Sequence, residues 1–219
     1  MLRFQNKVVI VTGSSSGIGA ATALLFAKEG ANVTITGRNA EGVERTRKAI
    51  VEVGISEDHI NCVIADVTDS NGRQRIVDST LKKWKRLDIL VNNAGASITY
   101  GKEGFEASEE AYAKTMDINL NRIAGEAQKK QRKIARKLEQ KNRVSCDASA
   151  TLLLRFLCKF VEFVQTPYYA VAKAGLDQLT RALAIDLIEH GVRVNGVSPG
   201  IVRTNFMQAV GLTKEQTDK

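Results

Sequence analysis

Residues 7–19 read Lys-Val-Val-Ile-Val-Thr-Gly-Ser-Ser-Ser-Gly-Ile-Gly, and this stretch decides the fold. Its apolar, β-branched first half predicts a buried strand from Lys7 to Thr12. The glycines that follow permit a tight turn, and the apolar residues after them predict a helix. Because a helix N-terminus carries a partial positive charge, this unit is a candidate site for a dinucleotide pyrophosphate. The alternative is an ordinary turn between a strand and a helix.

The rest of the chain alternates short apolar runs with helical periods. Such alternation predicts parallel strands joined by right-handed helical crossovers. Further strands are expected at Asn32 to Thr36, His59 to Ile64, Asp88 to Val91 and Val192 to Val197. Helices are expected after Gly17 up to Gly30, and at Ala40 to Val53, Ser70 to Lys85 and Tyr168 to Glu189. The predicted fold class is α/β, a doubly wound parallel sheet of Rossmann type in one domain over residues 1–219.

Residues 121–165 depart from this pattern, being first basic and then apolar. Between Glu126 and Arg143, eight Lys and Arg residues stand against two Glu, a net charge of +6 out of +8 for the chain. Residues 151–165, TLLLRFLCKFVEFVQ, space their polar side chains as a helix does, although Thr151 to Leu154 also reads as a strand. A charge run is usually a solvated helix face, and without interleaved aromatic residues nucleic-acid binding is not expected.

Composition excludes several other classes of protein. With 219 residues, 43% of them apolar, the chain can bury one sizeable core. The three cysteines Cys62, Cys146 and Cys158 lack metal-ligand spacing and an even count, so neither a metal site nor a disulfide framework is expected. No apolar run is long enough for a membrane span, and the N-terminal apolar run leads straight into the glycine loop, which argues against a cleaved signal sequence. The expected location is cytoplasmic.

Four later segments complete a resemblance to a known family. They are Asp66-Val67, Asn92-Asn93-Ala94-Gly95, Tyr169-Ala-Val-Ala-Lys173, and Val194-Asn195 through Pro199-Gly200. Together with the GxxxGxG spacing of the glycine loop, they resemble the short-chain dehydrogenases/reductases in the same order. The resemblance covers residues 7–119 and 167–207 and implies a nicotinamide dinucleotide cofactor.

The residue nineteen positions after Gly19 bears on the choice of cofactor. An acidic side chain there would bond the adenosine ribose of NAD, whereas a cation would pair with the extra phosphate of NADP. The chain has Arg38, which favours NADP(H) over NAD(H). The alternative is a solvated loop arginine. The resemblance implies cofactor contacts from Gly13, Ser15, Ser16, Gly17, Ile18, Gly19, Arg38, Asp66, Val67, Asn93, Ala94, Gly95, Tyr169, Lys173, Pro199, Gly200 and Thr204.

Three residues carry the chemistry that the resemblance implies. Tyr169 and Lys173 are four residues apart and therefore share a helix face, where an ammonium favours the phenolate form of a phenol. In the family this tyrosine exchanges a proton with a substrate hydroxyl or carbonyl while hydride moves, and the lysine also bonds the nicotinamide ribose. Asn119 matches the asparagine that holds a proton-relay water. The implied function is an NADP(H)-dependent oxidoreductase that interconverts a small-molecule carbonyl and a secondary alcohol.

The serine that bonds the substrate oxygen in this family is missing from its usual place. It belongs at the end of the fifth strand, and counting back thirteen positions from Tyr169 reaches Phe156. Ser145 or Ser149 could serve only if a long insertion followed the strand. We therefore expect cofactor binding with poor turnover.

Two further departures concern assembly and the end of the chain. The basic segment stands where the family's dimer helix packs, so the family-type homo-oligomer is in doubt. The sequence ends at Lys219, ahead of the family's last helix and strand, so the last strand is expected to be missing. The alternative function is a non-catalytic dinucleotide-binding or scaffold protein whose basic segment contacts an acidic partner.

Overall fold

The computed structural model describes residues 2–96, 107–121, 150–154, 167–200, 202 and 204. Its strands are β1 (Val8–Val11), β2 (Asn32–Gly37), β3 (Ile60–Ile64), β4 (Ile89–Asn92), β5 (Ala150–Leu154) and β6 (Arg193–Val197). Its α-helices are α1 (Gly17–Lys28), α2 (Ala40–Glu52), α3 (Ser70–Trp84), α4 (Glu109–Met116) and α6 (Pro167–Ile188). A 3-10 helix, η1 (Glu57–His59), precedes β3, and a π-helical turn, η3 (Asp117–Asn121), follows α4.

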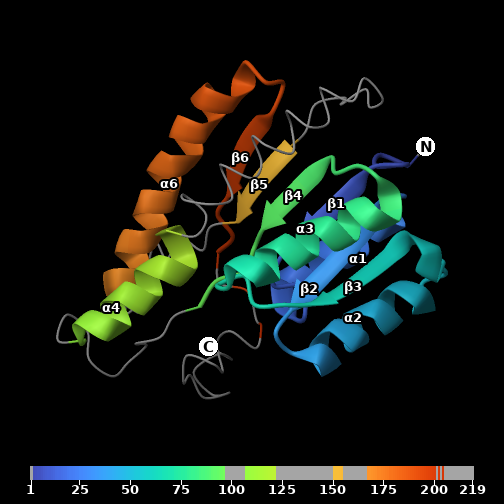
Figure 1. Cartoon of the computed structure of the whole chain (residues 1–219), viewed down its shortest axis with the longest axis horizontal. Helices are drawn as coiled ribbons and strands as arrows, with labels where there is room; N and C mark the ends of the chain where they lie inside the picture. The colour runs from blue at the N-terminus through green and yellow to red at the C-terminus, as the bar shows by residue number, and fades with distance from the viewer. Residues whose placement is uncertain are drawn as a thin grey trace.

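The six strands form one parallel sheet in the order β3-β2-β1-β4-β5-β6 (Figure 1). The strand order reverses between β1 and β4, and ligands of doubly wound sheets bind at the carboxyl ends beside such a reversal. The predicted α/β, Rossmann-type fold class is confirmed. The described residues contain no seventh strand. None of the described helices is long and apolar enough to cross a membrane.

The core covers both faces of the sheet, and β1 shows how. All four residues of this strand are fully buried. Val9 and Val11 pack into one cluster with residues of α1 and α2, whereas Ile10 packs into another with Ile76 of α3. Because successive strand side chains point to opposite faces, these helices lie on opposite sides of the sheet. This packing fixes the carboxyl end of β1, where the glycine loop begins.

The structure corrects the sequence prediction at His59, decides the open interpretation of Thr151 to Leu154, and adds two elements. His59 was expected in the third strand but lies in η1, because the Ser56 hydroxyl accepts a hydrogen bond from the Asp58 N–H and starts a helical turn there. The strand interpretation of Thr151 to Leu154 is confirmed, since these residues form β5 with Ala150. Neither α4 nor η3 was predicted. The rest of residues 121–165, including the basic segment, lies outside the described residues apart from Asn121.

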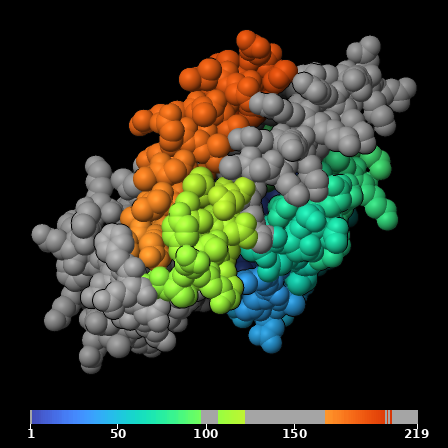
Figure 2. Space-filling model, turned by 60° about the vertical axis from the view of Figure 1, so that its left-hand side comes forward, coloured from blue at the N-terminus to red at the C-terminus, as the bar shows by residue number. Residues whose placement is uncertain are grey.

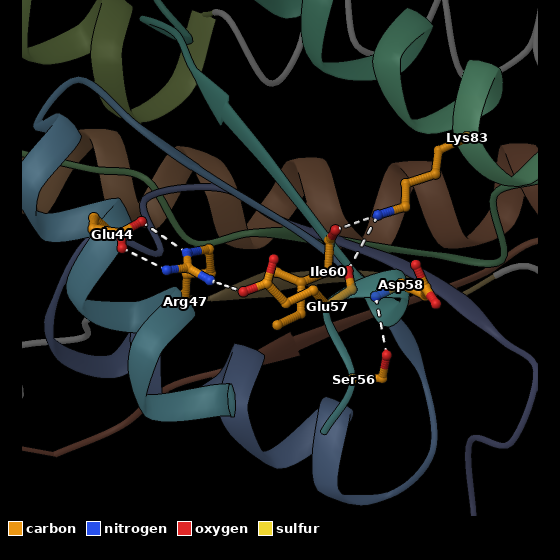
Figure 3. Close-up of polar contacts among 7 residues, drawn as sticks. All are labelled: Glu44, Arg47, Ser56, Glu57, Asp58, Ile60 and Lys83. Atoms are coloured by element: carbon orange, nitrogen blue, oxygen red, sulfur yellow. Dashed lines mark hydrogen bonds and ion pairs between the residues drawn. The ribbon is translucent and has the colours of Figure 1, made fainter. Parts of the chain in front are cut away.

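A polar cluster ties the edge strand β3 to the helices on either side (Figure 3). Lys83 of α3 donates hydrogen bonds to the carbonyl oxygens of Ile60, at 2.5 Å, and Glu57, at 3.3 Å. Arg47 of α2 pairs with both Glu44 and Glu57. An exposed sheet edge invites pairing with other chains, and cations at its start discourage this. The cluster lies at the amino end of β3, away from the carboxyl edge of the sheet.

Helices α4 and α6 lie side by side at the β6 end of the sheet (Figures 1 and 2). The rings of Tyr112 and Tyr168 meet edge to face with centroids 4.9 Å apart. Leu120 of η3 packs against Gly175 of α6, where an added Cβ would lie 2.7 Å from the Leu120 Cδ2 atom. This close approach brings η3 against the helix that carries Tyr169 and Lys173.

Candidate active site

The glycine loop rests directly on the segment that follows β4. A Cβ built on Gly19 would lie 2.3 Å from the Gly13 carbonyl oxygen and 2.4 Å from Asn93 Nδ2. A Cβ on Gly13 would lie 2.9 Å from Ala94 Cα, and Gly13 also has φ of +65°. Since no side chain fits at these contacts, both glycines are required by the geometry of the loop.

Hydrogen bonds from Thr12 and Asn93 lock the two segments together. The Thr12 hydroxyl accepts hydrogen bonds from the backbone N–H groups of Asn93, at 3.0 Å, and Ala94, at 3.1 Å, and donates to the Val91 carbonyl at 3.2 Å. The Asn93 amide donates to the carbonyl oxygens of Thr12, at 2.8 Å, and Gly13, at 3.1 Å. Sequence analysis did not single out Thr12. A hydroxyl residue at the last position before a glycine turn was the available signal.

The N-terminus of α1 has the character of an anion site. Its cap residue, Ser16, makes no side-chain capping bond, and its first turn contains no acidic residue. By contrast, the caps of α2, α3 and α4 all accept backbone hydrogen bonds. Gly17 has φ of +56°, and a Cβ there would lie 3.1 Å from Thr204 Cγ2. The uncapped N–H groups and the helix dipole fit a pyrophosphate, so this end of the site fits a dinucleotide.

A second group of residues lies where β2 and β3 end. Ser15 packs closely against Gly37 and Gly42. A Cβ on Gly37 would lie 2.8 Å from the Ser15 hydroxyl oxygen, and a Cβ on Gly42 would lie 2.6 Å from the Ser15 carbonyl oxygen. Arg38 follows, with 73% of its side chain exposed and its Nη1 atom 3.9 Å from Asp66 Oδ2. The structure thus brings together three residues that the sequence singled out separately.

The loop after β3 is held from within. Asp66 Oδ1 accepts a hydrogen bond of 2.7 Å from the Thr68 N–H. Arg73 of α3 donates to the Val67 carbonyl at 2.8 Å and the Thr68 carbonyl at 3.2 Å. Sequence analysis missed Arg73, because nothing in its spacing distinguishes it from a solvated helix residue.

Tyr169 and Lys173 lie buried on one face of α6. They are 6% and 3% exposed, and Lys173 Nζ is 5.2 Å from the centroid of the Tyr169 ring. A Cβ built on Gly95 would lie 3.4 Å from Lys173 Nζ and 3.0 Å from Asn119 Oδ1. Gly95 therefore marks the point where α6, η3 and the segment after β4 converge.

Asn119 is fully buried in the π-helical turn η3. Its amide donates to the carbonyl oxygens of Ala96, at 2.7 Å, and Thr115, at 2.9 Å. Its Oδ1 atom is buried and accepts no hydrogen bond within the described part of the chain. Single π-helical turns are frequent at functional sites. An unpaired carbonyl oxygen beside Lys173 has the chemistry that a water-holding residue needs.

Tyr168, the residue before Tyr169, faces α4 instead. Its hydroxyl donates a long bond of 3.5 Å to the Ala107 carbonyl, and its ring packs on Tyr112. This supports the choice of Tyr169 over its neighbour, which sequence analysis made from spacing to the lysine.

The remaining predicted residues fall into two groups. Pro199 and Gly200 follow β6 at the same edge of the sheet, and no atom of the described residues lies within 4 Å of the position that a Cβ of Gly200 would take. Ser145, Ser149 and Phe156 lie outside the described residues. The bounds of β5 give their order along the chain: Ser149 directly precedes Ala150 at its amino end, and Phe156 comes two residues after Leu154 at its carboxyl end.

Comparisons with known proteins agree with this geometry. A family model described as enoyl-(acyl carrier protein) reductase matches residues 13–219. The rabbit (Oryctolagus cuniculus) dehydrogenase/reductase SDR family member 4 is 31% identical over 213 residues, which make up 97% of this chain and 77% of that protein. A crystal structure of a Caenorhabditis elegans short-chain dehydrogenase/reductase with cofactor is 42% identical, with a TM-score of 0.84 over 99% of this chain and 77% of that chain. A Brucella melitensis 3-ketoacyl-(acyl-carrier-protein) reductase complexed with NADH is 25% identical, with a TM-score of 0.81 over 94% of this chain and 80% of that chain.

These findings define the class of protein. The chain belongs to the short-chain dehydrogenase/reductase family, a family of oxidoreductases. Two of the solved relatives hold a cofactor, which in the Brucella melitensis protein is NADH. The expected family resemblance is confirmed.

Proposed function

We propose that this chain is an NADP(H)-dependent oxidoreductase acting on a carbonyl or secondary alcohol, with low turnover. The observation that carries the proposal is the buried pair of Tyr169 and Lys173, which meets Asn119 at Gly95. A phenol and an ammonium buried together at the carboxyl edge of a parallel sheet suit proton transfer to a ligand bound there.

Tyr169 acts as the general acid or base in this proposal. The nearby Lys173 ammonium favours the phenolate, which makes it easier for Tyr169 to donate its proton to a carbonyl oxygen. NADP(H), when bound, supplies or accepts the hydride. The Asn119 Oδ1 atom, to which no described residue donates, lies near Lys173 at Gly95 and so offers a place for a water molecule that returns the proton. Lys173 would hold the ribose of the cofactor.

The preference for NADP(H) rests on Arg38. Its side chain is exposed just after β2, and the residue before it, Gly37, lies close to the Ser15 hydroxyl oxygen. A planar fork of donors suits a phosphate and offers nothing to a bare ribose that needs an acceptor. Arg38 is the residue that we assign to this discrimination.

Calorimetry with both cofactors tests that assignment. Wild type should bind NADPH more tightly than NADH by about tenfold or more, the value of a charge-assisted pair. Arg38→Ala should remove most of the difference while leaving NADH binding nearly unchanged. Equal affinity of the wild type for both cofactors would contradict the preference.

Low turnover follows from the place of β5. Since this strand ends at Leu154, the residues next in sequence at its carboxyl end are Arg155 and Phe156, and neither serine candidate follows the strand. Losing one donor to the substrate oxygen costs about 10²–10³ in rate. We therefore expect NADPH to protect the chain against unfolding while carbonyl reduction stays near background.

A panel of carbonyl substrates, run with wild type and Tyr169→Phe, separates the possible outcomes. A slow wild-type rate that rises in proportion to enzyme concentration and is lost in Tyr169→Phe, with NADPH protection intact, supports the proposal. Robust turnover that Tyr169→Phe abolishes would contradict the low rate but confirm the role of Tyr169. If NADPH protects the chain but no substrate is turned over at any enzyme concentration, the result would favour the non-catalytic alternative. Two statements stay predictions: that the basic segment works against the family-type dimer, and that the protein is cytoplasmic.

A further inference from the structure

Arg38 and Asp66 form an ion pair at the carboxyl ends of neighbouring strands. The Nη1 and Oδ2 atoms are 3.9 Å apart, a separation at which charge attraction acts without a hydrogen bond. Arg38, the residue proposed to bind the phosphate, is therefore already paired with the Asp66 carboxylate, and a phosphate bound there would lie near the same carboxylate.

The two partners differ in freedom. Asp66 is held in a turn, since its Oδ1 accepts the Thr68 N–H at 2.7 Å, and a Cβ on Gly72 would lie only 2.2 Å from its carbonyl oxygen. Arg38 is largely exposed and follows a strand end, so its side chain can move. When a phosphate binds near this pair, Arg38 can therefore move toward it, whereas the Asp66 carboxylate stays in place.

We propose that Asp66 is a specificity-determining residue that limits the preference for NADP(H), because its carboxylate competes with the 2′-phosphate for Arg38. This inference rests on the proposed function of Arg38. A guanidinium presents one planar fork of N–H donors. When this fork is directed at Asp66, its charge and its donors are less available to a phosphate.

The expected size of the effect is small because the pair is exposed. Exposed ion pairs contribute little, and the competition should change the affinity ratio by about two- to fivefold. It should also shrink with added salt, as the Debye length falls below the separation of the charges involved.

The test is the ratio of the dissociation constants of NADH and NADPH, measured by calorimetry on the full chain. Asp66→Asn is the variant of choice, since its amide oxygen can still accept the Thr68 N–H and keep the turn. Any loss of contacts to the parts that both cofactors share cancels in the ratio. The proposal expects the ratio to rise about two- to fivefold in favour of NADPH.

Two controls make the result specific. Asp69→Asn removes the same charge three residues away, and asparagine caps α3 as well as aspartate does, so the ratio should stay at the wild-type value. In the Arg38→Ala background, Asp66→Asn should change the ratio little, since the competition is gone. The proposal is supported if Asp66→Asn raises the ratio when Arg38 is present and does not raise it in Arg38→Ala.

Other outcomes overturn it. A ratio that stays constant or falls in Asp66→Asn shows that Asp66 either does not act on Arg38 or positions it for the phosphate, even if Arg38→Ala abolishes the NADPH preference. A wild type without any NADPH preference, unchanged by Arg38→Ala, overturns the proposed function as well. The Arg38→Ala measurement therefore tells the two failures apart.

Discussion

Two corners of the site are built in different ways. At the glycine loop, neighbouring backbone segments pack without intervening side chains, and Thr12 and Asn93 satisfy the backbone around them. At Tyr169, three elements from distant parts of the sequence converge through side chains, and the Asn119 Oδ1 atom is left without a partner in the described residues. At the glycine-loop corner the fold itself fixes the two backbone segments, and the uncapped N-terminus of α1 is available to a ligand. The Tyr169 corner has a polar atom that remains free to serve chemistry.

The comparison predicts different consequences of mutation. A change at the glycine loop should disturb folding and cofactor binding together, because the same contacts serve both. A change at the Tyr169 corner should disturb a smaller number of contacts, because the elements are held together mainly by packing elsewhere, such as that of Leu176, Leu183 and Leu187.

The largest effect is expected from Gly19→Ala. The new Cβ would lie 2.3 Å from a backbone carbonyl oxygen and 2.4 Å from the Asn93 amide, so the loop and the segment after β4 must separate. Overpacking of this kind costs about 1–3 kcal/mol or more. Urea denaturation should show that loss, and NADPH should no longer raise the melting temperature.

Gly54→Ala is the matched control. Gly54 has φ of +88°, but no atom of the described part of the chain lies within 4 Å of its Cβ position, so alanine there suffers backbone strain without a collision. It should lose about 1 kcal/mol and keep the full NADPH shift. If both variants keep the shift, the close packing of the glycine loop is not what shapes the cofactor site.

A smaller effect is expected from Asn119→Leu. Leucine has a similar size but leaves the carbonyl groups of Ala96 and Thr115 without their donor. Leaving buried acceptors unsatisfied costs about 1–3 kcal/mol. The cost is partly offset here because Ala96 is only partly buried and because the Oδ1 atom, which has no partner among the described residues, is removed as well. The net loss in urea denaturation should fall at the low end of that range.

Asn121→Leu, an exposed change on the same turn, provides the comparison for Asn119. It should stay within about 0.5 kcal/mol of wild type. Should Asn119→Leu stabilise the chain instead, the Oδ1 atom without a described partner would be the dominant feature of the Tyr169 corner, and the two corners would differ more strongly.

The same contrast explains what could be predicted from the sequence. The strands and helices up to Asn92 follow from local periodicity, and the glycine loop and Asn93 lie together because they end neighbouring parallel strands. The pairing of Gly17 with Thr204 could be expected only from the family resemblance. The turn η3 has no local signature, since its geometry depends on packing against Gly175 of α6. Likewise β5 was ambiguous because a short apolar run suits a strand or a buried helix equally, and only pairing with β4 and β6 decides it.

The smallest effect concerns Asp69, the N-cap residue of α3, and its contribution to the pH dependence of the free energy of unfolding. Hydrogen bonds from the backbone N–H groups of Asn71 and Gly72 lower the pKa of Asp69 below its ordinary value of 3.8. Because the folded pKa is the lower one, the ionised carboxylate contributes stability above the unfolded pKa, and this contribution is lost as the pH falls through the folded pKa. Asparagine caps the helix at every pH, so the urea midpoint of Asp69→Asn should fall less than that of wild type when the pH is lowered from 5 to about 2. Since Asp69 is exposed, the difference should be slight. A wild-type midpoint that falls no more than that of the variant over this range would show that these two hydrogen bonds do not favour the charged form.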